Sequence, residues 1–141
     1  MIIEEDVELI LTDGGFLSAF TDYAGNAQPA PTLQLITFDE DATYAQGKRI
    51  LFIREGGGGG GSRYVQNSGV SIVFVGLQSK TDAAIVKDFA DRIFTYLLET
   101  REKCGIIGID PLTGASPVMY TDLGRPVVEI QCILKIDRGI K

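Results

Sequence analysis

The chain has 141 residues, of which 45% are hydrophobic and 23% are charged, so it is long enough to bury one core and too short for two. Acidic residues outnumber basic ones by 19 to 13, for a formal net charge of -6, which argues against a protein that coats nucleic acid through Lys and Arg contacts to phosphate. Histidine is absent, which removes the commonest general base, the Ser-His and Cys-His nucleophile systems and most zinc sites.

The first residues, MIIEEDVELIL, carry acids where a secretory signal would carry Lys or Arg, and no apolar run reaches the roughly 18 residues of a membrane span. We therefore expect a single domain over residues 1–141 that is made in a cytoplasm and has no membrane partner. Cys104 follows a helical pattern and Cys132 lies in an alternating strand, so two reduced, structural thiols are favoured over a disulfide.

The N-terminal third contains helix, turn and strand signals in that order. Residues 5–20 place apolar side chains at helical spacing, but Gly14 and Gly15 interrupt them, so we predict a short N-terminal helix. Residues 21–32 contain two prolines and several other turn formers, which predict an exposed connection. Leu33–Phe38 then predicts a strand.

An acidic turn, DEDAT, follows this strand and raises the question of calcium. An EF-hand loop that began at Asp39 would need Gly at its sixth position and Glu at its twelfth, whereas this chain has Tyr44 and Ile50 there. We therefore expect no metal site at this turn.

Two apolar segments, Arg49–Arg54 and Tyr64–Leu77, predict neighbouring strands that are covered on both faces. Between them lies EGGGGGGS, and we predict a flexible glycine-rich loop at 55–63. A P-loop is disfavoured because Ser62 and Arg63 stand where its Lys is required, and a dinucleotide fingerprint would open a helix rather than a strand. An inserted cloning linker of the same composition remains an alternative.

Residues 80–102 predict the main helix of the protein. One side is apolar and is expected to pack: Ile85, Val86, Phe89, Ile93, Tyr96 and Leu97. The opposite side is polar and is expected to be solvated: Lys87, Asp88, Asp91, Arg92, Thr95 and Glu99. Ser79 and Asp82 resemble a capping box at its start, and Gly105 suits the position after its end. We also expect Asp82 to lie on or near the solvated side.

The C-terminal segment Val128–Asp137 alternates between apolar and polar residues and predicts a half-buried strand, with Ile133 as one apolar residue on its outer face. A short apolar piece and a long Gly/Pro-rich excursion separate it from the main helix. Segregated strands and helices in this order favour an α+β fold, in which one long amphipathic helix and a shorter N-terminal helix pack on a mostly antiparallel sheet.

Neither a catalytic set nor a cofactor-binding motif emerges from these residues. The acids of the main helix are expected on or near its solvated side, and no Lys or Thr stands in a setting typical of a nucleophile. We therefore predict a protein that is not an enzyme and that has no catalytic residues, no cofactor and no metal.

Three segments resemble the tail terminator, or tail completion, proteins of long-tailed bacteriophages and prophages: RILFIREGGGGGGSRYVQNSGVSIVFVG, SKTDAAIVKDFADRIFTYLLET and TDLGRPVVEIQCILKID. The resemblance covers roughly residues 49–137. It implies a structural α+β subunit that forms a homohexameric ring, caps the finished tail tube and joins it to head-completion proteins, with DNA passing through the ring. Its place would be the head-tail junction of the virion, after assembly in the host cytoplasm.

Four residues at the base of the glycine run are the candidate partner contacts: Arg54, Glu55, Arg63 and Tyr64. A glycine-rich loop could adapt to an irregular tail surface, although ordering it would cost conformational entropy. The alternative is that these residues simply end two strands. Two other functions stay open, another head-tail connector component and a small ligand-binding α+β domain.

Overall fold

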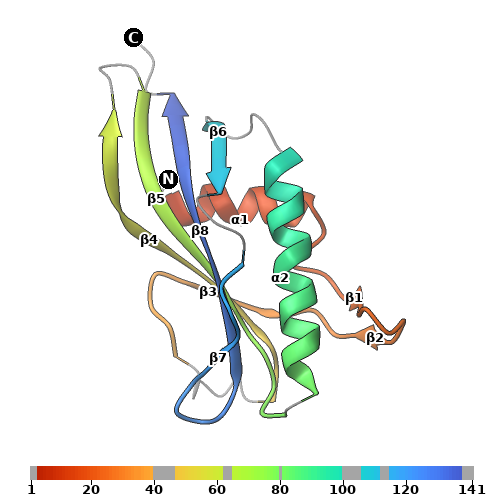
Figure 1. Cartoon of the computed structure of the whole chain (residues 1–141). Coiled ribbons are helices and arrows are strands. Elements are labelled where there is room, and N and C mark those ends of the chain that lie inside the picture. The colour runs from red at the N-terminus through yellow and green to blue at the C-terminus, as the bar shows by residue number, and fades with distance from the viewer. Residues whose placement is uncertain are drawn as a thin grey trace.

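The computed structural model describes residues 3–39, 47–61, 65–79, 81–99, 106–111 and 115–137 of the chain. Its elements in chain order are α1 (Ile3–Asp13), β1 (Phe20–Thr21), β2 (Ala27–Gln28), β3 (Thr32–Leu35), β4 (Ile50–Gly61), β5 (Val65–Val75), α2 (Asp82–Glu99), β6 (Ile106–Pro111), β7 (Met119–Tyr120) and β8 (Pro126–Asp137). Helices and a mostly antiparallel sheet are segregated along the chain, which confirms the α+β class (Figure 1).

The main sheet has the strand order β3-β4-β5-β8-β6, and β7 also pairs with β8. Its long strands β4, β5 and β8 are antiparallel to their neighbours in this group, whereas β3 runs parallel to β4. The predicted strand Leu33–Phe38 is shorter in the structure: β3 ends at Leu35, and Ile36 has a φ of 72°, which extended backbone does not adopt.

Helix α1 confirms the predicted N-terminal helix, with earlier bounds than expected. Three acids in its first turn interact favourably with the positive end of the helix dipole. At the other end Gly15 has a φ of 81°, and the N–H of Phe16 donates to the carbonyl of Leu11 at 3.0 Å. This is a Schellman ending, so the two glycines stop the helix rather than interrupt it.

Helix α2 packs on the sheet through the predicted side, and α1 contributes to the same core. Val86, Phe89, Ile93 and Leu97 are buried, whereas Ile85 and Tyr96 are only partly buried. Phe89 stacks on Phe74 of β5 with ring centroids 4.2 Å apart. A large apolar contact between helix and sheet therefore supplies the main core.

A second, smaller apolar cluster lies on the other face of the sheet. It contains Ile50, Phe52 and Val75, all buried, and Phe38 packs on Phe52 with ring centroids 5.4 Å apart. The first residues of β4 and the last residues of β5 are therefore buried on both faces of the sheet, as their apolar sequences predict.

Residues 21–32 are not merely an exposed connection. They complete a two-stranded sheet, in which Phe20 pairs with Gln28 and Thr21 with Ala27. Asp22 lies buried in the intervening turn, where its carboxylate accepts the backbone N–H groups of Ala24 and Asn26, each at 2.9 Å. This Asx-type turn closes the hairpin.

Candidate interaction surface

The glycine run extends β4, so the predicted loop at 55–63 is wrong for residues 55–61. Glu55 pairs with Val70, and Gly57, Gly58 and Gly61 pair with Gly69, Ser68 and Gln66, with two irregularities in register. Glycine has a low intrinsic tendency to form strands, so pairing with β5 determines this conformation. Residues 62–64 lie outside the described residues.

Arg54 is a predicted contact residue that is accessible to a partner. Its side chain is 53% exposed, and Nη2 lies 3.5 Å from Oε2 of Glu129 on β8. An exposed ion pair at this distance contributes little to stability, so the guanidinium remains available to another acidic group. Arg63 and Tyr64, predicted to act beside it, lie outside the described residues.

Glu55 connects the glycine-rich part of β4 to helix α1. Its backbone N–H donates to Oε2 of Glu4 at 3.2 Å, and the Glu4 side chain is buried while Glu55 itself is exposed. The pairing of β3 with β4 ends at Ile53. Glu4 therefore accepts the hydrogen bond of the Glu55 N–H, which β3 does not reach.

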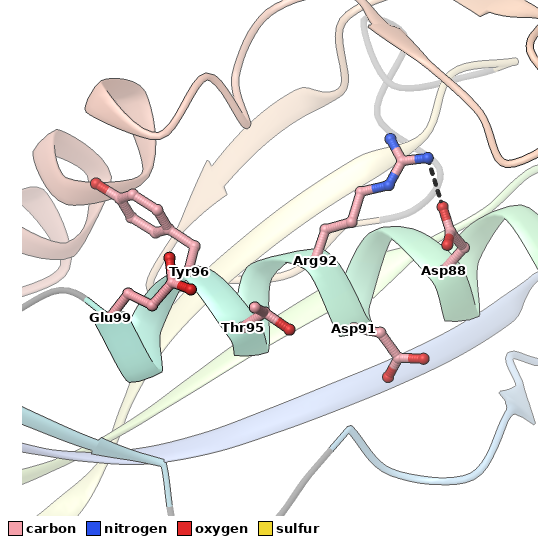
Figure 2. A pocket seen from close by; sticks show the side chains of 6 residues that line it. All are labelled: Asp88, Asp91, Arg92, Thr95, Tyr96 and Glu99. Carbon is pink, nitrogen blue, oxygen red and sulfur yellow. Dashed lines mark ion pairs between the residues drawn. The ribbon is translucent and has the colours of Figure 1, made fainter.

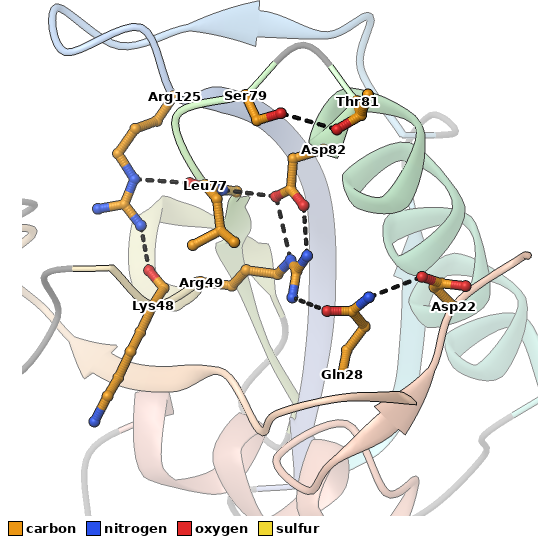
Figure 3. A network of polar contacts seen from close by, with 10 residues as sticks. Asp22, Gln28, Lys48, Arg49, Leu77, Ser79, Thr81, Asp82 and Arg125 are labelled. Atoms are coloured by element: carbon orange, nitrogen blue, oxygen red, sulfur yellow. Dashed lines mark hydrogen bonds and ion pairs between the residues drawn. The ribbon is translucent and has the colours of Figure 1, made fainter. Parts of the chain in front are cut away.

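A buried polar group lies at the opposite end of β4, and we call Arg49, Asp82, Gln28 and Asp22 the arginine cluster (Figure 3). Arg49 Nη2 lies 2.5 Å from Asp82 Oδ1, and both side chains are only 4% exposed. Gln28 accepts from Arg49 Nη1 at 2.9 Å and donates to Asp22 at 2.8 Å. Every charge in this chain of contacts therefore has a hydrogen-bonding partner.

The burial of Asp82 corrects the sequence prediction, which placed this residue on or near the solvated side and in a capping box. Its Oδ2 accepts the backbone N–H of Leu77 at 2.6 Å in addition to its bonds with Arg49. Ser79 hydrogen-bonds to Thr81 instead. Arg49 is 33 positions away, so sequence spacing gave no signal for the pair.

Arg125, the residue before β8, bonds to the backbone at the same end of the sheet. Its Nε donates to the carbonyl of Gly76 at 2.7 Å, and a second guanidinium nitrogen donates to the carbonyl of Lys48. A Cβ at Gly76 would lie 2.4 Å from Asp82 Oδ2, so only glycine fits there. The roles of these residues are structural, since they bind one another and the backbone.

The solvated side of α2 forms an open hollow of about 380 Å³ (Figure 2). Six residues line it: Asp88, Asp91, Arg92, Thr95, Tyr96 and Glu99. Arg92 forms an ion pair with Asp88 at 2.7 Å and donates to the carbonyl of Thr21 at 2.6 Å. The Tyr96 hydroxyl donates to the carbonyl of Ile10 at 3.1 Å. Three of the six lining residues, Asp88, Arg92 and Tyr96, are thus engaged in structural contacts, and the lining residues define neither a nucleophile nor an acid-base pair.

Exposed apolar side chains gather at the hairpin between β7 and β8. Met119, Tyr120 and Leu123 are all exposed, and Tyr120 borders a second hollow with Gln78, Ser79 and Gly124. Large apolar side chains grouped on a protruding turn are typical of protein contacts. The sequence analysis gave this hairpin no role, because its residues show no periodic pattern.

Metal and thiol chemistry have no evident place in the described part of the chain. No group of three or more carboxylate or thiol residues there could hold a metal ion, and Cys132 is free and buried. Burial raises the pKa of the Cys132 thiol to about 12, so it stays protonated and unreactive near neutral pH. Cys104 lies outside the described residues.

Fold and surface together define an α+β protein whose distinctive features are strand edges and exposed side chains suited to protein contacts. The sequence of residues 15–137 matches the family of phage tail termination proteins. That match covers most of the chain, and the protein therefore belongs to this family, as its sequence resemblance predicted. Membership places it among structural components of phage tails.

Other comparisons add no relative. Neither a curated protein nor a solved structure matches the chain significantly. In the described residues, no helix is both long and apolar enough to cross a membrane.

Proposed function

We propose that this protein forms a homohexameric ring that caps the phage tail tube, stops its growth and joins it to head-completion proteins. The single observation that supports this proposal is the family match over residues 15–137. The protein acts without catalysis or a cofactor, at the head-tail junction of the virion, after assembly in the host cytoplasm. DNA passes through the ring, and a net charge of -6 favours sliding over binding.

Tail assembly in the absence of this protein tests the proposal. We expect a phage that lacks the gene to produce abnormally long tubes or tails without heads, and the supplied wild-type protein to restore tails of uniform length with heads attached. Electron microscopy of lysates measures both features. Normal virions from the deletion strain would contradict the proposed function.

The partner contacts are proposed at Arg54, Glu55, Arg63 and Tyr64. Arg54 supports this choice, because its guanidinium is exposed and held only by a long ion pair with Glu129. We expect Arg54→Ala combined with Arg63→Ala to leave the fold and the ring intact but to weaken binding to tail tubes. Lys48→Ala, which removes an exposed cation at the other end of β4, is the matched control. Equal co-sedimentation of both variants with tail tubes would exclude Arg54 and Arg63 as contacts.

A further inference from the structure

We propose that the glycine-rich part of β4 pairs, antiparallel, with β6 of a second copy of this chain, with Gly58 opposite Ile109. This inference rests on the ring assembly proposed above and names the surfaces that build it. A partner strand added to an open sheet edge gains main-chain hydrogen bonds along its length.

Two strands of the main sheet have an open edge at the same end of the molecule. β4 pairs with β5 through Gly61, whereas on its other side β3 pairs only as far as Ile53, and Glu4 takes the N–H of Glu55. Beyond that point, no other strand in the described ranges pairs with β4 on this side. On the opposite side β6 is the last strand of the sheet as far as the chain is described, and there it pairs only with β8 (Figure 1).

The open edges lie at the same level in the sheet. Gly58 is opposite Ser68, Ser68 is opposite Leu134, and Leu134 is opposite Ile109. These four residues therefore form one row that crosses the sheet from its β4 edge to its β6 edge. A ring with its axis along the strands closes only when its mating groups are level, because any offset would produce a helical filament.

Both ends of this row direct their backbone groups outward. The backbone N–H and C=O of Glu129 bond to Ser116, so the backbone N–H and C=O groups of odd-numbered residues in β8 are directed away from β5. Backbone direction alternates along a strand, so Leu134 points toward Ser68 and the two form a hydrogen-bonded pair. The backbone groups of Ser68 and Leu134 bond to each other, so they are not directed at Gly58 or Ile109. The N–H and C=O groups of Gly58 and Ile109 therefore face outward from the two edges of the sheet.

Strand direction is also compatible with pairing between copies. β4 is antiparallel to β5, β5 to β8, and β8 to β6, so β6 is antiparallel to β4. Two copies in the same orientation therefore bring β6 of one copy antiparallel to β4 of the next. Each copy uses both edges once, and this head-to-tail contact can repeat until the ring closes.

Glycine suits the receiving edge. Natural sheets usually protect an open edge with Lys, Pro or a covering segment, but the run from Gly56 to Gly61 contains none of these side chains. A strand without side chains lets another backbone approach closely. On β6, Pro111 lies two residues beyond Ile109 at an outward-facing position, so its missing N–H removes one hydrogen bond from the pairing between copies and none from the sheet of its own chain.

A proline at position 58 tests the pairing directly. Gly58→Pro removes the outward N–H and spares the bonds to β5, whereas the matched control Gly58→Ala keeps that N–H. We expect the proline variant to raise the dissociation constant for self-association by about tenfold or more, and the alanine variant to leave it nearly unchanged. Light scattering over a concentration series measures assembly, and circular dichroism checks the fold.

Cysteine cross-linking tests the register independently of the proline variant. Pairing of Gly58 with Ile109 places Gly57 opposite Asp110 in the neighbouring copy, at a separation that a disulfide can bridge. We expect Gly57→Cys with Asp110→Cys, in a Cys104→Ser background, to form covalent ladders of copies on oxidation. Cys132 can remain because its thiol is buried and protonated. Gly57→Cys with Ile106→Cys is the control, since four residues shift the second thiol by about 13 Å.

The outcomes separate this pairing from the proposed function. Cross-linking of the Asp110 pair together with dissociation of Gly58→Pro supports the pairing. Rings that form equally well in Gly58→Pro, or ladders from both cysteine pairs alike, overturn it while tail termination in the complementation assay still stands. A folded wild-type protein that stays monomeric, with or without tail tubes, together with no ladder from the Gly57→Cys and Asp110→Cys pair, overturns the pairing as well.

Discussion

Arg49 shows how one buried cation can join three segments of the chain. Its guanidinium bonds to Asp82 at the start of α2 and to Gln28 in β2, and it lies 5.7 Å from the ring centre of Phe20. A buried ion pair of this kind offsets its own desolvation only when every donor and acceptor is satisfied. Removal of one partner is therefore expected to lower the free energy of unfolding by far more than the net contribution of the pair.

We expect Asp82→Ala to lower the free energy of unfolding by about 3–5 kcal/mol, because it leaves the Arg49 guanidinium buried without its carboxylate. Asp91→Ala is the control. Asp91 is exposed, and its Oδ1 lies as far as 3.8 Å from Lys87 Nζ, so its removal should lower the free energy of unfolding by less than about 0.5 kcal/mol. Urea denaturation at neutral pH measures both. Similar unfolding midpoints for the two variants would show that the buried pair contributes nothing.

Asp22 should make stability depend on pH in the acid range. The backbone hydrogen bond from Asn26, with further help from Gln28, Ala24 and the charge of Arg49, lowers the pKa of Asp22 from its ordinary value of 3.8. A group whose pKa is lower in the folded state stabilises the fold above the unfolded pKa, and this contribution is lost as pH falls through the folded value.

We therefore expect Asp22→Asn to be less stable than wild type at pH 7 and the difference to shrink as pH falls below the ordinary pKa of 3.8, where the unfolded carboxyl takes up its proton before the folded one does. Urea melts of both proteins at several pH values measure this gap. A gap that stays constant from pH 7 to pH 3 would show that the charge of Asp22 is not responsible.

At the scale of the element, α2 supplies the side chain on which the core depends most visibly. Phe89 contacts the rings of Phe16, Phe20 and Phe74 at centroid distances of 5.6, 4.7 and 4.2 Å. These rings come from the loop after α1, from β1 and from β5, so one helical residue joins three other parts of the chain.

We expect Phe89→Ala to cost about 3–5 kcal/mol, through lost apolar burial and the cavity that remains. Thr95→Ala, on the solvated side of the same helix, should change stability by less than about 0.5 kcal/mol. Thermal and urea melts compare the two, and equal losses would mean that the assignment of the faces of α2 is wrong.

The elements differ in how far their sequences determine them. α2 was predictable because burial of one side imposes a helical period that the residues display. β4 beyond Glu55 was not, because glycine has no side chain to alternate, and only pairing with β5 selects the extended form. The hairpin of β1 and β2 consists of strands of two residues, too short for any period to register.

The candidate site was predictable in part for the same reasons. The exposure of Arg54 and Glu55 was predictable because they are charged residues that follow an apolar segment, whereas their role as partner contacts stays a prediction. The buried pair of Arg49 and Asp82 could not, because two charges distant in sequence reveal their contact only after the chain folds. The open edges of β4 and β6 belong to the backbone, which side-chain patterns do not describe.

At the scale of the whole molecule, β5 and β8 are the centre of the sheet. Each has a strand on both sides over much of its length, and their inward residues fill the main core. The hairpin of β1 and β2 is held by two residue pairs and forms a separate small sheet. Resistance to opening should therefore vary strongly along the chain.

We expect the slowest amide hydrogen exchange in Val70–Val75 and Val128–Leu134, with protection that approaches the free energy of global unfolding, and the fastest exchange of the strand amides in β1 and β2. Exchange followed by mass spectrometry on proteolytic peptides measures this order. Protection that is greatest in β1 and β2 would contradict the assignment of the central strands.

The contrast between the two ends of the sheet gives the subunit a direction. At one end the polar groups of the arginine cluster and Arg125 bond to one another and to the backbone, and the hairpin between β7 and β8 exposes apolar side chains. At the other, β4 continues as bare backbone to Gly61. A subunit with different surfaces at its two ends cannot be turned over without losing its contacts. Such a body can mark the end of a polymer, because a second layer stacked upon it would meet a different surface from the first.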